Sequence, residues 1–187
     1  MSIRSSKSFL LTFWYNPVRS MRQLLDLRQG HSWALAVAAL FGMIQFSRLL
    51  PVTSNALARY LVFYGLVGVT CLFLFGWLIR NFGRWFGVDA AQREIRTALG
   101  LGILPWTILF AVLSLMLGSG FAPESVANRY ALIVPILLIY GFYILILSLM
   151  AALRLSVIKT FLCLTVTILF SVFPLTLLAQ LLSSYIR

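Results

Sequence analysis

Five long apolar runs, charged only near their ends, limit what this chain can fold into. They cover roughly residues 33–50, 57–79, 97–117, 130–153 and 160–183. Each has about the 17–25 residues that a helix needs to cross a bilayer. Helices satisfy their own backbone in lipid, and the runs lack the alternation of a membrane barrel. The sequence predicts an all-α, polytopic membrane protein: a five-helix transmembrane bundle over residues 33–187, after an N-terminal segment of residues 1–32.

Composition supports lipid as the main solvent of this chain. Only 10% of the 187 residues are charged and 61% are hydrophobic, whereas a soluble domain is roughly 25% charged. The net charge of +11 arises from 15 basic and 4 acidic residues. Because the basic residues lie between the apolar runs, topology and anionic lipid explain them, and we expect no nucleic-acid partner.

The basic residues divide unequally between the two sets of connections. One set carries Arg4, Lys7, Arg19, Arg22, Arg28, Arg80, Arg84, Arg93, Arg96, Arg154 and Lys159, and the other Arg48, Arg59, Arg129 and Arg187. Connections rich in Lys and Arg stay in the cytosol. We therefore expect a multi-pass protein of the cell membrane with a cytosolic N-terminus and the C-terminus on the opposite side.

The N-terminal segment predicts a short amphipathic helix. Asn16 and Pro17 have the residue types preferred at the N-cap and the first helical position. An apolar face and a polar face follow at helical spacing, the first with Val18, Met21, Leu24 and Leu25 and the second with Arg19, Arg22, Gln23 and Asp26. Such a helix is typical of a segment that lies on the membrane surface.

The connector between the second and third runs predicts a turn followed by a helix. Gly87 permits a sharp turn, and the spacing of Asp89 and Gln92 is that of a capping box. We expect one helix to leave the surface here and enter lipid. Pro105 should interrupt it about two turns later, because proline leaves the carbonyl of Leu101 without its usual donor.

Few residues on this chain could perform chemistry. There are four carboxylates, one histidine and two cysteines, and no phosphate loop, HExxH or CxxC motif. We expect neither an enzyme, a metal nor a cofactor. An alternative is a small transporter or transport-accessory subunit, because Pro105, Pro135 and Pro174 place one candidate helix kink in each of the last three runs, and broken helices can line a cavity.

Two segments resemble the bacterial Yip-domain family of integral membrane proteins. They are residues 87–99, followed by Leu104-Pro105-Trp106, and the opening residues 16–25, which begin Asn16-Pro17-Val18-Arg19. Ala90-Ala91-Gln92 departs from the family pattern, where a serine and an aromatic residue are expected. The resemblance implies a small polytopic protein in the bacterial inner membrane, with a role of the membrane-organisation or trafficking type.

These observations lead to one hypothesis about function. We expect the cytosolic face to bind anionic headgroups, and possible partners include other membrane proteins or a second copy of the chain. The candidate contact residues are Arg19, Arg22, Arg84, Trp85, Asp89, Arg93, Glu94 and Arg96.

Overall fold

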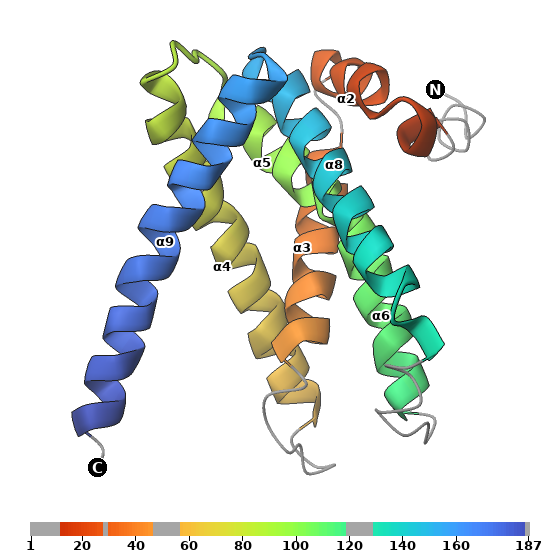
Figure 1. The fold of residues 1–187 in the computed structure, drawn as a ribbon, viewed down its shortest axis with the longest axis vertical. Coiled ribbons are helices and arrows are strands. Elements are labelled where there is room, and N and C mark those ends of the chain that lie inside the picture. Colours follow the sequence, from red (N-terminus) through yellow and green to blue (C-terminus); the bar gives the residue numbers. More distant parts are fainter. Residues whose placement is uncertain (1–11, 28–29, 47–56, 119–128, 186–187) are drawn as a thin grey trace.

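The computed structural model describes residues 12–27, 30–46, 57–118 and 129–185, and within these ranges it contains helices and no strand. Figure 1 shows the helices running between two ends of the molecule, with α2 across one end. Their bounds are α2 Pro17–Asp26, α3 His31–Phe46, α4 Leu57–Arg84, α5 Gln92–Gly102, α6 Leu104–Gly118, α8 Ile133–Leu153 and α9 Val157–Tyr185. The prediction of an all-helical protein is confirmed.

Three helical stretches are long and apolar enough to cross a membrane. They are Tyr60–Arg84, Gln92–Leu117 and Ile133–Leu153. The first and last of the five predicted spans coincide with α3 and α9. Within the described residues, these helices contribute the shorter apolar stretches His31–Gln45 and Val157–Ser171. Large apolar side chains lie exposed along the helices, including Leu115 on α6 and Leu132 just before α8. Exposed apolar surface of this extent is what lipid would cover.

Helix α5 is the most enclosed element of the fold. Ile95 and the continuous run from Thr97 to Gly102 are all buried, and α5 packs against α3, α4 and α8. Small residues allow this close packing: a Cβ on Gly100 would lie 2.7 Å from the Cβ of Ala34 in α3. A Cβ on Gly102 would lie 2.8 Å from a methyl group of Leu145 in α8. Helices approach this closely in membranes where small residues line the contact.

Helices α3 and α4 cross with their backbones in direct contact at two glycines. A Cβ on Gly42 would lie 2.5 Å from the carbonyl oxygen of Tyr64 and 2.7 Å from the Cα of Gly68. A Cβ on Gly68 would meet the carbonyl oxygen of Ala38. The crossing therefore has no room for a side chain at either glycine.

The turn from α4 to α5 is closed by a Schellman motif. The N–H of Val88 donates to the carbonyl of Gly83 (3.1 Å), and that of Gly87 to the carbonyl of Arg84 (3.0 Å). Gly87 has φ +80°, the left-handed conformation that this motif requires. The sharp turn predicted at Gly87 is present. The predicted capping box is wrong, however: the N-cap of α5 is Ala91, which makes no side-chain cap hydrogen bond, so Asp89 lies outside the helix that it was expected to start.

The prolines occupy three different positions. Pro105 is the second residue of α6 and follows the interruption at Ile103 that separates α5 from α6. Pro135 is the third residue of α8, within the first turn, where proline removes no intrahelical hydrogen bond. The helical backbone of α9 continues through Pro174, whose side chain lies outside the described part.

Helix α2 packs against α8 and α5. The side chain of Asn16 accepts the N–H of Arg19 (3.4 Å), and Pro17 is the first helical residue, as the sequence predicts. Met21, expected on the lipid-facing side, is instead buried within the protein. Just before α2, the Tyr140 hydroxyl of α8 donates to the carbonyl of Trp14 (2.9 Å), and the two rings stack. The helix is thereby fixed to the bundle.

The turn between α8 and α9 contains a strained residue. Arg154 has φ 55° and ψ 32° at the C-cap of α8, a left-handed conformation that costs a non-glycine residue about 1 kcal/mol. The Ser156 hydroxyl then accepts the N–H of Lys159 (3.5 Å) and caps α9. Beyond this turn α9 diverges from α3 and α4 toward the opposite end (Figure 1).

Candidate functional site

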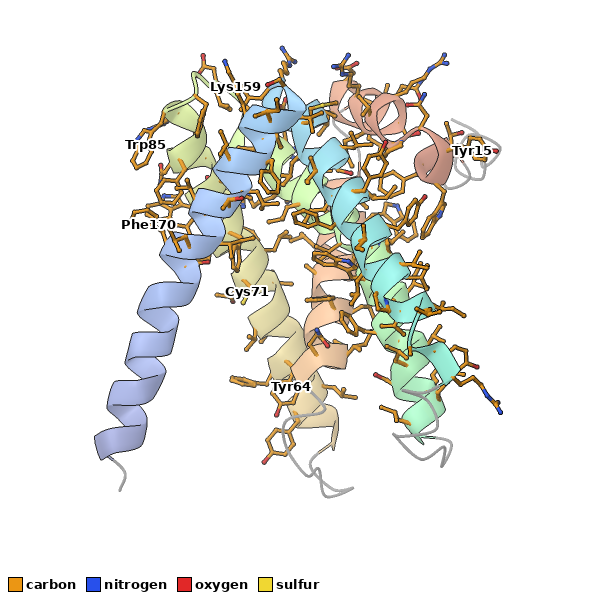
Figure 2. All side chains as sticks on the ribbon, in the orientation of Figure 1. Tyr15, Tyr64, Cys71, Trp85, Lys159 and Phe170 are labelled. Carbon is orange, nitrogen blue, oxygen red and sulfur yellow. The ribbon has the colours of Figure 1, made fainter. Side chains whose placement is uncertain are left out.

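The structure brings basic residues from four separate segments to one end of the helices, here called the basic end. These segments are α2, the last turns of α4, the first turn and a half of α5, and the α8–α9 turn, all at the same end in Figure 1. Figure 2 labels Lys159 there and shows other nitrogen-bearing side chains beside it. The described basic residues of this end are Arg19, Arg22, Arg80, Arg84, Arg93, Arg96, Arg154 and Lys159.

The opposite end carries less described charge. Arg129, before α8, is exposed there. Arg48 and Arg187 lie outside the described residues, as does the side chain of Arg59. Among the acidic residues, Asp26, Asp89 and Glu94 all belong to elements of the basic end, and Glu94 lies in the first turn of α5, where a negative charge is favourable.

The predicted contact residues occupy different environments at the basic end. Arg19, Arg22, Arg84, Asp89 and Arg93 are exposed. Trp85 is 71% exposed, and its ring meets that of Phe82 edge-on with the centroids 5.1 Å apart. Exposed tryptophan at the end of an apolar helix is typical of the headgroup region. Arg96 differs from the other arginines because it is half-buried between two helices.

Arg96 is held by two contacts with α4 and by one hydrogen bond within α5. Its guanidinium carbon lies 4.2 Å from the centre of the Phe73 ring, a distance at which the ring attracts the cation. Its Nε donates to the carbonyl of Gln92 (3.2 Å). The stem of Arg96 runs over Gly76, where an added Cβ would lie 2.6 Å from the Arg96 Cγ. We call Arg96, Phe73 and Gly76 the Arg96 seat.

His31 lies next to this seat at the start of α3. Its Nδ1 is 3.4 Å from the Thr97 hydroxyl oxygen, and that hydroxyl lies 2.8 Å from the Arg93 carbonyl and donates to it. A hydroxyl has one hydrogen to donate. Because the Arg93 carbonyl receives it, the Thr97 oxygen is left to accept a hydrogen bond from Nδ1 when that nitrogen carries a proton.

The environment of His31 lowers its pKa from the ordinary value of 6.5, first through burial and then through the positive charges of Arg93 and Arg96. The unfolded chain therefore binds the proton more readily, so stability falls as the pH drops through 6.5 and the loss is complete below the lowered pKa. We expect unfolding in mixed micelles to become easier between about pH 8 and pH 5, across the histidine range. His31→Gln should reduce this pH dependence. A pH profile identical to that of wild type would contradict a lowered pKa of His31.

Within the described residues, no group of three or more His, Cys, Asp or Glu side chains is placed to hold a metal ion. Cys71 and Cys163 are free thiols, and the Cys163 thiol contacts the carbonyl of Ile79 across the α9–α4 contact. No family model, curated protein or solved structure matches this chain. The chemistry of the basic end must be argued from its own residues.

Sequence reasoning missed the α4 side of the Arg96 seat. Phe73, Gly76 and Arg80 are spaced to share one face of α4, and this spacing was the available signal. It did not show that Arg96, on another helix, lies over Gly76. The prediction that Arg19, Arg22, Arg84, Trp85, Asp89, Arg93, Glu94 and Arg96 form one contact surface stays a prediction, although α2 and the α4–α5 turn lie at the same end (Figure 1).

Proposed function

We propose that this chain is a non-enzymatic integral membrane protein whose basic end binds the anionic headgroups of the cytosolic leaflet. One observation carries the proposal: segments far apart in sequence bring arginine and lysine side chains to the same end of helices with exposed apolar sides. Juxtamembrane basic residues attract anionic lipid by about 1 kcal/mol each. The described cations outnumber the carboxylates at this end.

The proposal includes five membrane crossings. Helices α3, α4, α5 with α6, α8 and α9 each run between the two ends in Figure 1. Helix α2 lies at the basic end and the last turns of α9 at the other, which agrees with an odd number of crossings. On this topology the N-terminal segment is cytosolic. Membership of the Yip family, in the bacterial inner membrane, stays part of this proposal and rests on the two resembling segments alone.

The transporter alternative receives less support from the described residues. The side chains of Leu132, Ile133 and Ile136, which flank Pro135, are exposed and apolar. Pro105 is buried at the start of α6. A substrate cavity needs polar groups near such prolines, and the described neighbours of Pro135 on its own helix supply none.

A charge-neutralisation experiment tests the function. Native mass spectrometry of the full chain in detergent micelles would compare binding of phosphatidylglycerol with that of phosphatidylcholine. We expect wild type to prefer the anionic lipid and Arg84→Gln to weaken its binding about fivefold, the effect of roughly 1 kcal/mol. Arg129→Gln removes the same charge from an exposed site at the opposite end and should change little. Equal binding of both lipids by wild type would contradict the proposal.

A further inference from the structure

Arg96 is held in place without being neutralised. Its Nε bonds to a backbone carbonyl and its guanidinium lies on an aromatic ring. Within the described part of the chain, the structure pairs it with no carboxylate. A guanidinium has five N–H donors in a planar fork that matches a phosphate. One donor is used by Gln92, so the terminal amino groups retain capacity for a ligand with negative charge.

The surroundings of Arg96 favour a ligand that is also apolar. Phe73, under the guanidinium, is 41% exposed, and Trp77, one turn further along α4, is 52% exposed. Both side chains belong to a helical stretch long and apolar enough to cross a membrane. Phe73 lies 11 residues before Arg84, the last residue of α4, so the Arg96 charge lies inside the apolar length of this helix, where a charge draws water or headgroups toward it. A soluble anion would gain nothing from these exposed rings.

A second cation lies on the same face of α4. Arg80 follows Gly76 by four residues and Phe73 by seven, which places it one turn above the position where the stem of Arg96 crosses α4. Arg80 is half-buried. The Arg96 guanidinium lies over Phe73, so a group bound to it would have Arg80 on the side nearer the basic end.

We propose that the Arg96 seat, together with Arg80, binds the phosphate of a single anionic phospholipid whose acyl chains lie along Phe73 and Trp77. This inference rests on the proposed function, because the basic end must face lipid headgroups, and it adds a defined site to that function. Arg96 supplies a fixed, planar donor pair and Arg80 a second positive charge. Gly76 is required because any larger residue would displace the Arg96 stem.

Native mass spectrometry with stepwise addition of phosphatidylglycerol to the full chain tests this site. We expect the first lipid bound to wild type to bind about tenfold more tightly than the later ones, as bidentate, charge-assisted hydrogen bonds allow. Arg96→Gln should abolish this tight step. Gly76→Ala should abolish it as well, although it removes no charge. Arg96→Lys keeps the charge without the planar fork. It should lose most of the difference in affinity between the first lipid and the later ones.

Comparison variants separate the site from the general basic end. Arg22→Gln, on α2, should weaken binding of the later lipids and leave the affinity of the first lipid unchanged. Arg129→Gln should change neither affinity. Circular dichroism would verify that each variant is folded. Wild type that prefers anionic lipid without a distinct tight step would overturn the site but keep the proposed function, whereas no preference at all would remove both. Displacement of the tight lipid by inorganic phosphate would assign the site to a soluble anion and overturn the lipid.

Discussion

Replacing Gly68 with alanine is expected to lower the free energy of unfolding by about 2 kcal/mol, because the added methyl group would overpack a tight contact. The new Cβ would meet the carbonyl oxygen of Ala38 and lie 2.9 Å from the Cα of Gly42. Both are backbone atoms, so relief requires α3 and α4 to separate. Unfolding of the purified protein by SDS in mixed micelles, followed by circular dichroism, would measure the change.

Gly65→Ala provides a matched control on the same helix. Its Cβ would lie 2.7 Å from the terminal methyl group of Met43. Because methionine is flexible, that contact can relax by a side-chain rotation. We expect a change in unfolding free energy of less than about 0.5 kcal/mol, as at a permissive site. Equal losses for the two variants would show that the crossing is not as close as the structure places it.

The second large effect is expected at the contact between α6 and α8. The Trp106 indole N–H donates to the carbonyl of Leu138 (3.0 Å), and its ring lies against Gly141. A methyl group at Gly141 would clash with the Cδ1 and Nε1 atoms of the indole ring. Gly141→Ala should displace the ring, break the hydrogen bond and cost about 2 kcal/mol through lost packing and lost bonding together. The same SDS titration measures it.

A double-mutant cycle identifies the cause of that loss. In a Trp106→Ala background the indole is absent, so Gly141→Ala should then cost little. The coupling between the two positions should reach about 2 kcal/mol, within the range of residues in direct contact. A cost for Gly141→Ala that persists without Trp106 would place the clash elsewhere.

Local features of this fold could be predicted from the sequence because they depend on neighbouring residues. The apolar runs marked where the helices lie, since lipid requires about twenty apolar residues in a row. Asn16 and Pro17 marked the start of α2, and Gly87 the turn after α4. The capping box failed because Asp89 lies two residues before Ala91, the N-cap of α5. The spacing of Asp89 and Gln92 is therefore that of a capping box, although no capping box forms.

Contacts between helices were harder to predict. Gly83 and Gly87 lie four residues apart, a spacing that can favour helix dimerisation, but both instead belong to one Schellman turn, which runs from Gly83 to Val88. Other glycines lie in the contacts between helices: Gly42 against Gly68, and Gly141 against Trp106. Their spacing in the sequence did not mark them as contact residues. For the same reason Arg96 was expected as one member of a basic surface, and its seat on Phe73 and Gly76 required the relative placement of α4 and α5.

The hydrogen bond from Tyr140 to Trp14 joins residues that are 126 positions apart. During synthesis the N-terminal segment leaves the ribosome long before α8 exists, so α2 lacks its main partner for most of translation. Its buried side chains, Met21 among them, cannot reach their final packing until α8 has been made. Docking of α2 against α8 is therefore a late step of folding.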